Sequence, residues 1–167
     1  MRPSILDPLF RPVSSLKGVG PKIAVMMERV AGPLVRDLVY LAPAGIVDRR
    51  YQPKAIDAEP GRLATLQLKI VGHQPSRSRR QPYRVIAADA TGEVALVFFH
   101  ASKPYLERLL PPGEERLISG MVEHYRGMPQ ITHPDHIVSL EDAADLPLVE
   151  PVYPLTAGLT GKTLRKG

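Results

Sequence analysis

The feature that most constrains the fold is a change of hydrophobic period near residue 64. The segment "TLQLKIVG" places apolar side chains at Leu66, Leu68 and Ile70, with polar side chains between them. Alternation with a period of two is typical of a strand that is buried on one face only. The residues before this point have no such alternation. We therefore expect a helical N-terminal segment followed by a domain that consists mainly of strands.

The later segments predict an order of elements that identifies the fold. "YRVIAADA" and "EVALVFFH" read as two strands separated by a tight turn at Thr91-Gly92. A short helix, "KPYLERLL", follows, and then two strands, "RLISGMVEHY" and "PQITHPDHIVSL". Three strands, a helix and two more strands is the order of an OB-fold, a five-stranded Greek-key barrel. The expected class is therefore mainly β with α: an OB-fold barrel with a short helix between strands three and four, preceded by a small helical segment.

Proline, glycine and polar residues suggest where the parts of the chain begin and end. In "PKIAVMMERVA" the apolar residues have helical spacing, with Pro21 at its start and Gly32-Pro33 at its end. "LVRDLVYLAP" reads as a second short helix, and Gly120 inside the fourth strand predicts a bulge or sharp bend. The expected parts are a helical segment (residues 1–50), a polar connection (51–63), the barrel (64–143) and a C-terminal connector (144–167).

The densest positive charge lies on the predicted loop between the first two strands. No acidic residue occurs between Gly72 and Ala88. In an OB-fold this loop, the loop between strands four and five and the face of strands two and three bind oligonucleotides. Guanidinium groups pair with phosphates, and an interleaved tyrosine adds a stacking surface. The alternative is a solvated hairpin tip. We favour nucleic-acid binding by Arg77, Arg79, Arg80, Tyr83 and Arg84.

Further aromatic and basic residues fall near the same predicted surface. Phe98 and Phe99 are adjacent in a strand, so one should face the core and the other should face outward or lie under the helix. Phe99 and Tyr105 could stack on unpaired bases or could both cap the barrel end, and spacing alone slightly favours the cap. Lys103, together with Tyr125 and Arg126 from the loop between strands four and five, should line the groove.

The N-terminal stretch "LKGVGPKIA" resembles a helix-hairpin-helix motif. In that motif a Gly-apolar-Gly turn points backbone N–H groups at a phosphate. Gly18 and Gly20 would permit the turn, and Lys22 adds charge. A plain turn between two helices packed on the barrel explains the sequence equally well, so both interpretations stay open and these three residues are weaker phosphate-contact candidates.

Several other kinds of site are excluded or disfavoured by the sequence. "TAGLTGKT" lacks the first glycine of a phosphate-binding P-loop, because Thr156 stands there. In an extended strand His133 and His136 would point to opposite faces, which disfavours a metal site, and surface histidines are the better interpretation. The absence of cysteine excludes disulfides and a thiol nucleophile. We therefore expect no catalytic residue, metal or cofactor in this sequence.

Charge and hydropathy limit the partners. The net charge of +5, from 22 lysines and arginines against 17 aspartates and glutamates, favours a polyanionic partner. No apolar run approaches the roughly 18 residues of a membrane span, and the N-terminus has no signal-peptide pattern. Cysteine usage fits a reducing compartment, and we expect a cytoplasmic location.

Several motifs in order also carry a family resemblance. "SSLKGVGPKIA", "DATGEVALVFFH", "ISGMVEHYRGMPQITHPD" and "PVYPLTAGLTGKTLRK" together resemble the amino-terminal portion of RecG, the bacterial ATP-dependent branched-DNA helicase. The resemblance runs from about residue 14 to the end. It implies an OB-fold "wedge" domain that precedes two RecA-like motor domains, which this sequence does not include. ATP and Mg²⁺ are implied for those motor domains, and residues 144–167 would lead into the first of them.

The resemblance also implies a role and a set of partners. The wedge would dock on a stalled fork or Holliday junction and split nascent strands from the template, in DNA recombination, repair and fork reversal. Family aromatics that contact the branch-point bases match Phe99 and Tyr105 here, although the spacing between them is longer than usual. The resemblance thus favours stacking over the barrel cap. The expected protein is a monomer that binds branched DNA and the single-stranded-DNA-binding protein.

Two other functions remain open at the level of sequence. The arginine-rich loop could bind an acidic segment of a partner protein, since OB-folds also serve as protein-interaction modules. Single-stranded RNA would use the same charge and stacking chemistry as single-stranded DNA. Whether the chain has enzymatic activity is left open, but a catalytic function of its own is the least expected class.

Overall fold

A computed structural model describes residues 3–76, 78 and 81–155 of the chain. Asp48–Val149 form one compact unit, and the described residues on either side of it form a second. Arg77, Arg79 and Arg80 lie outside the described residues, as does the "TAGLTGKT" segment at 156–163.

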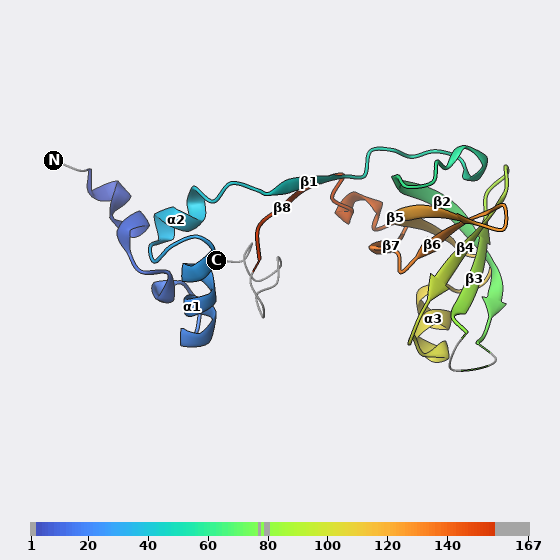
Figure 1. Cartoon of the computed structure of the whole chain (residues 1–167), viewed down its shortest axis with the longest axis horizontal. Helices are drawn as coiled ribbons and strands as arrows, with labels where there is room; N and C mark the ends of the chain where they lie inside the picture. Colours follow the sequence, from blue (N-terminus) through green and yellow to red (C-terminus); the bar gives the residue numbers. More distant parts are fainter. Residues whose placement is uncertain (1–2, 77, 79–80, 156–167) are drawn as a thin grey trace. The chain divides into compact units, whose positions relative to one another are not determined.

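Five strands of the Asp48–Val149 unit close into a barrel (Figure 1). Neighbouring strands are antiparallel, except that β4 and β6 run parallel and close the barrel. This connectivity, with a helix between the third and fourth strands, is that of an OB-fold and confirms the predicted fold. The strands are β2 (Leu63–Gln74), β3 (Tyr83–Ala88), β4 (Glu93–Phe98), β5 (Glu115–Tyr125) and β6 (Met128–Thr132).

Helix α3 (Lys103–Leu109) lies at one end of the barrel (Figure 1). Pro104 occupies its first turn, where a missing N–H costs nothing. Leu106 and Leu110 are completely buried and belong to the same core cluster as the inward-facing residues of the strands. The barrel is therefore plugged by Leu106 of the helix and by Leu110 directly after it.

The predicted fifth strand is two strands, which corrects the sequence-based expectation. β6 ends at Thr132, and β7 (His136–Ser139) begins after His133, whose φ of 48° breaks the extended backbone, and Pro134. β7 pairs with residues 116–119 of β5, and β6 pairs with residues 122–125 of the same strand. Both segments run antiparallel to β5, one after the other, with the break at residues 133–135 between them.

The sequence predicted a bulge or sharp bend at Gly120, and the β2–β5 pairing has no bulge there. The β2–β5 register runs without a shift from Leu63↔Met121 to Lys69↔Glu115. A register shift occurs instead in the β2–β3 pairing, between Ile70 and Gly72. A Cβ at position 120 would clash with the Ile131 side chain and lie 3.3 Å from Cα of Pro134. Gly120 is thus explained by close approach of the β6–β7 segment.

The unit outside the barrel is mainly helical in its N-terminal part, as the sequence predicted. Its small core consists of Val13, Ala24 and Met27, against which Val30 and other apolar side chains of the predicted helical face pack. Asp37 accepts a hydrogen bond from the Leu34 N–H (2.9 Å) and so begins the second helix. The elements are two 3₁₀ segments, η1 (Ser4–Phe10) and η2 (Val13–Ser15), and the helices α1 (Pro21–Val30) and α2 (Val35–Val39).

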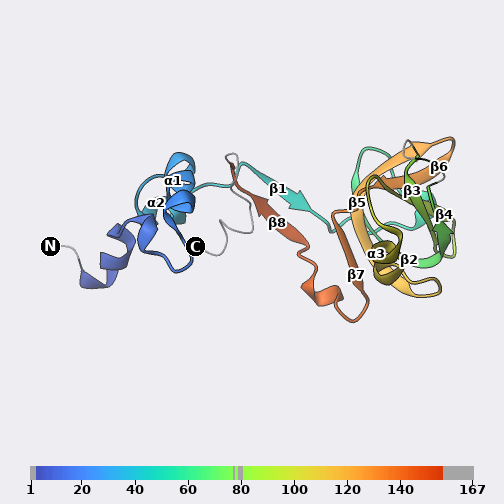
Figure 2. The same cartoon turned by 90° about the horizontal axis from the view of Figure 1, so that it is seen from below.

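A two-stranded ribbon was not predicted. β1 (Gly45–Asp48) pairs with β8 (Val149–Val152), about a hundred residues later in the chain (Figure 2). The remaining short elements are the 3₁₀ segments η3 (Ala55–Asp57) and η4 (Ala143–Asp145). Within the described residues no helix has the length and apolar character needed to span a bilayer.

Candidate nucleic-acid interface

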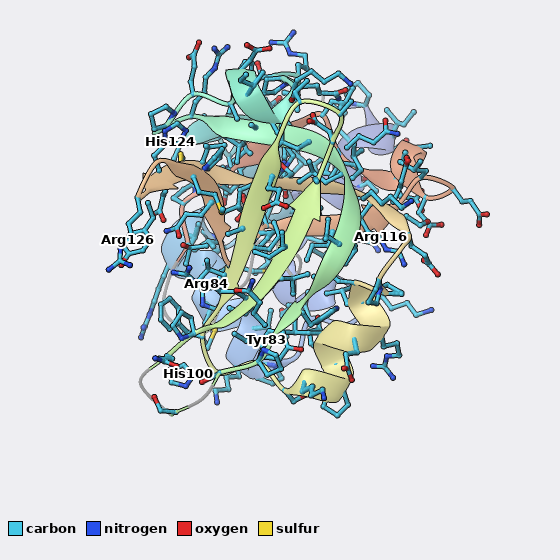
Figure 3. The ribbon with its side chains drawn as sticks, turned by 90° about the vertical axis from the view of Figure 1, so that its right-hand side faces the viewer. Tyr83, Arg84, His100, Arg116, His124 and Arg126 are labelled. Carbon is cyan, nitrogen blue, oxygen red and sulfur yellow. The ribbon has the colours of Figure 1, made fainter. Side chains whose placement is uncertain are left out.

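Two arginines converge on one exposed tyrosine at the mouth of a groove in the barrel unit. Tyr125 ends β5 and is 45% exposed. The guanidinium carbon of Arg84, on β3, lies 5.5 Å from the Tyr125 ring centroid, and that of Arg126 lies 5.3 Å from it. Both distances are within the range of cation–π attraction. Figure 3 shows Arg84 and Arg126 on the same side of the barrel, away from Arg116.

The groove next to this cluster has a volume of about 850 Å³. Among the described residues, neither Arg84 nor Arg126 forms an ion pair with a carboxylate, so both guanidinium groups keep hydrogen-bonding capacity for an anion. The groove therefore combines the half-buried guanidinium of Arg84 with the exposed ring of Tyr125. Its lining residues are His73, Gln74, Pro75, Gln81, Pro82, Arg84 and Tyr125.

Phe99 and Tyr105 lie beyond the end of β4 and on α3, respectively. Phe98 faces the core at 7% exposure, while Phe99 is 46% and Tyr105 50% exposed. The expected division of the two phenylalanines is thus confirmed. The alternative that Phe99 and Tyr105 cap the barrel end is wrong, because Leu106 and Leu110 fill that position.

Lys103 is near Phe99 and Tyr105 in sequence, but it forms an ion pair with Glu107. Its Nζ lies 3.6 Å from a carboxylate oxygen of Glu107, one turn later on the same helix. Exposed pairs of this kind are weak, so the lysine can still exchange partners. Its capacity to hold a phosphate is nevertheless smaller than that of Arg84.

Tyr83 is not available for stacking, which corrects the expectation for this residue. It is 5% exposed and belongs to the barrel core with its β3 neighbour Val85. Its hydroxyl lies 2.9 Å from Nδ1 of His73, whose Nε2 lies 2.7 Å from the Leu110 carbonyl oxygen. Burial, with a smaller contribution from Glu107, raises the pKa of Tyr83. Tyr83 thus serves the core, while Arg84 faces the groove.

The sequence did not indicate that His133 lies against Phe99. The Phe99 N–H donates a hydrogen bond to Nε2 of His133 (3.2 Å), and the two ring centroids are 5.7 Å apart. The residues are 34 positions apart in the chain, and no spacing rule connects them. The interpretation of His133 as a surface histidine considered only its neighbours in sequence.

The glycine-rich turn before α1 belongs to the other unit. Gly18 has a φ of 86°, and Gly20 is the N-cap residue of α1. The element before the turn is the single 3₁₀ turn η2 rather than a helix. A Cβ at either glycine would meet nothing within 4 Å, and Lys22 is exposed. The turn is accessible, but it lacks the first helix of a helix-hairpin-helix.

The described residues do not suggest a metal site. No group of three or more histidines, aspartates or glutamates lies close enough together among them to hold a metal ion. The cluster of Arg84, Tyr125 and Arg126 offers electrostatic attraction, hydrogen bonding and stacking.

The fold and the surface first define a class: an OB-fold barrel whose exposed face combines arginine with aromatic side chains. Comparison with known proteins then gives the family. The family model of the RecG wedge domain matches residues 12–167. The chain belongs to the RecG wedge domain family, as its motifs predicted.

Individual relatives agree with this assignment. The ATP-dependent DNA helicase RecG of Pasteurella multocida is 28% identical over 158 residues, which cover 93% of this chain and 22% of that protein. RecG of Escherichia coli K12 is 28% identical over 169 residues, covering 99% and 24%. A solved structure of RecG bound to a three-way DNA junction superposes with a TM-score of 0.74 at 26% identity, covering 95% of this chain and 22% of that one. The chain thus spans about a quarter or less of these relatives.

Proposed function

We propose that this chain is the DNA-binding wedge of a branched-DNA helicase. It binds a fork or Holliday junction and separates strands at the branch point during recombination, repair and reversal of stalled replication forks. The observation that carries the proposal is the exposure of Phe99 and Tyr105 beside a buried Phe98. Rings that a barrel leaves in solvent can stack on bases that have lost their partners. Family membership and the relative bound to a three-way junction support the same function.

In this proposal two parts of the surface make different contacts with DNA. Phe99 and Tyr105 stack on the bases at the branch point. Arg84 and Arg126, whose guanidinium groups both lie near the Tyr125 ring, hold phosphates, and that ring stacks on a base of the emerging strand. Neither part reads base edges, so the affinity depends on DNA shape and salt rather than on sequence. Lys103, Arg77, Arg79 and Arg80 add positive charge, and Gly18, Gly20 and Lys22 provide a weaker phosphate contact.

The proposal extends to the longer protein of which such a domain is part. Strand separation is driven there by ATP-dependent motor domains with Mg²⁺, toward which residues 144–167 lead. The proposed organisation places the helical segment at 1–50, a connection at 51–63 and the wedge at 64–143. The protein acts as a monomer in the cytoplasm, and an acidic tail of the single-stranded-DNA-binding protein is a second partner for the arginine-rich loop.

Fluorescence anisotropy with this 167-residue chain tests the proposal. A three-arm fork, a matched duplex and a matched single strand are titrated over a salt series. The same titrations are made with the double variant Phe99→Ala/Tyr105→Ala and with the control Tyr40→Ala, which removes an exposed tyrosine outside the barrel unit.

We expect the wild-type chain and the control to prefer the fork. The double variant should lose that preference while keeping its salt dependence, because the arginine–phosphate contacts remain. Equal affinity of the wild-type chain for the fork and the duplex would contradict the wedge function. If the chain binds none of the three DNAs but does bind an acidic peptide, a protein-interaction function replaces the proposed wedge function.

A further inference from the structure

We propose that His133 is a positioning residue that holds Phe99 in the orientation in which it stacks on the branch-point base. The inference rests on the proposed function of Phe99 and adds to it a residue that directly follows strand β6. It is carried by a hydrogen bond, by two ring contacts and by an unusual backbone conformation, all at position 133.

Two hydrogen bonds join position 133 to the end of β4. The His133 N–H donates to the Val97 carbonyl oxygen (2.9 Å), which continues the parallel β4–β6 pairing by one step. The Phe99 N–H donates to Nε2 of His133 (3.2 Å). Phe99 lies one residue past the end of β4, where the barrel ladder no longer fixes the backbone. The imidazole thus replaces the missing strand partner at the residue that carries the exposed ring.

The acceptor role fixes the state of the imidazole. Nε2 can accept from a backbone N–H only through its lone pair, so the ring proton is on Nδ1. A protonated imidazole has no lone pair to offer. A side chain of similar size that has no acceptor atom could not accept the hydrogen bond from the Phe99 N–H either.

The imidazole also contacts both phenylalanine rings. It meets the buried Phe98 edge-on, with centroids 6.2 Å apart and planes at 90°, and it is tilted by 38° to the Phe99 ring at 5.7 Å. Phe98 belongs to the barrel core, so it supplies a fixed support for the histidine ring. A chain of contacts therefore runs from the core through His133 to the exposed Phe99.

The backbone at this point adopts a conformation that non-glycine residues rarely use. His133 has a φ of 48°, and His100, directly after Phe99, has a φ of 60°. Such conformations cost free energy and persist where the surrounding structure determines them, often at binding sites. Here the turn at position 133 ends β6 and places the imidazole under Phe99.

Two variants of His133 separate the hydrogen bond from the ring contacts. His133→Gln keeps an acceptor near the position of Nε2 but removes the ring. His133→Phe keeps a ring but removes the acceptor. Both retain a side chain at the positive φ, so their backbone costs are similar. The readouts are the fork-to-duplex affinity ratio and the fluorescence of 2-aminopurine at the branch point of the three-arm fork.

We expect His133→Phe to lower the fork-to-duplex ratio by about three- to ten-fold, the effect of losing one hydrogen bond. His133→Gln should recover most of the loss. The quenching of 2-aminopurine on binding should weaken in His133→Phe and return in His133→Gln. If His133→Phe does not keep the wild-type melting temperature, His133→Asn replaces it, because asparagine tolerates a positive φ and its amide is too short to reach the Phe99 N–H.

A double-variant comparison distinguishes positioning from a structural effect. If His133 acts through Phe99, then Phe99→Ala/His133→Phe binds the fork no more weakly than Phe99→Ala alone. The positioning role alone would be overturned if the two substitutions weakened fork binding additively. It would also be overturned if Phe99→Ala lowered the fork-to-duplex affinity ratio and His133→Phe left it unchanged. An unchanged ratio in Phe99→Ala itself would overturn the proposed function of the ring.

Discussion

At the scale of single residues, the groove derives its properties from the pairing of charge with an aromatic face. Tyr125 is contacted by Arg84 from a neighbouring part of the barrel and by Arg126 from the adjacent turn. A guanidinium that stacks on a ring can still direct its N–H groups outward. The same side chains can therefore hold the tyrosine ring in place and bind phosphate.

Replacing Arg84 with glutamine should weaken binding to the fork, the duplex and the single strand by a similar factor. Arg84→Gln removes one phosphate contact and its counterion release, so the slope of log K against log salt should fall by about 1. Anisotropy titrations over a salt series measure the slope. Arg29→Gln, an exposed arginine at the end of α1, is the matched control. An unchanged slope in Arg84→Gln would show that this guanidinium does not contact DNA.

Alternation along the strands predicted some of the site residues and failed for others. It correctly separated Phe98 from Phe99, because adjacent strand residues face opposite sides. The same rule places Tyr83 on the inward face with Val85, but the arginines around Tyr83 led to its interpretation as a stacking residue. His133 could not be predicted, since its contact with Phe99 depends on the parallel β4–β6 pairing.

At the scale of elements, the barrel strands and α3 follow from hydrophobic period and proline placement. The β1–β8 ribbon does not, because its strands are only four residues long, one contains proline, and they lie far apart in the chain. The break between β6 and β7 is carried by the positive φ at His133 and by Pro134. The sequence "ITHPDHIV" was predicted as one strand because the apolar residues on both sides of the break resemble a continuous strand.

Replacing Gly120 with alanine should destabilise the barrel. The added Cβ clashes with the Ile131 side chain and approaches the backbone of Pro134, so the β6–β7 segment must shift. We expect the free energy of unfolding to fall by about 1–3 kcal/mol, as for other overpacked cores. Urea unfolding measures it, with Gly45→Ala as the control because a Cβ there meets nothing within 4 Å. Wild-type stability in Gly120→Ala would contradict the close approach.

Asp89 should make the stability of the barrel depend on pH in the acidic range. Burial raises the pKa of this carboxyl, but hydrogen bonds from the Thr91 hydroxyl and from the N–H groups of Ala55, Thr91 and Gly92 outweigh it, so the pKa lies below its ordinary value of 3.8. A lowered carboxyl pKa stabilises the folded state above the unfolded pKa, and this contribution is lost as the pH falls through the folded pKa.

The variant Asp89→Asn removes this contribution at neutral pH. Its free energy of unfolding should lie below that of the wild-type chain at pH 7, and the gap should shrink as the pH falls below about 4. Urea unfolding at a series of pH values measures the gap. A gap that stays constant from pH 7 to pH 2.5 would show that the charge of Asp89 does not stabilise the turn.

At the scale of the whole molecule, positive charge and exposed aromatic rings occur together on one barrel. The net charge of +5 attracts a polyanion of any shape, whereas exposed rings can distinguish a branch point from a continuous helix. The chain spans 22% of the Pasteurella multocida helicase that it matches, so the proposed strand separation requires the remainder of such a protein. In this proposal the wedge contributes recognition of the branch.

Photo-crosslinking from the branch-point base tests whether Phe99 and Tyr105 contact that base. A three-arm fork carries 5-iodouracil at the branch-point base, a second fork carries it ten bases into one arm, and the crosslinked residues are identified by mass spectrometry. We expect crosslinks to Phe99 or Tyr105 from the first fork and none to these residues from the second. Crosslinks from the branch point that fall only on residues outside the barrel, such as Tyr40, would contradict it.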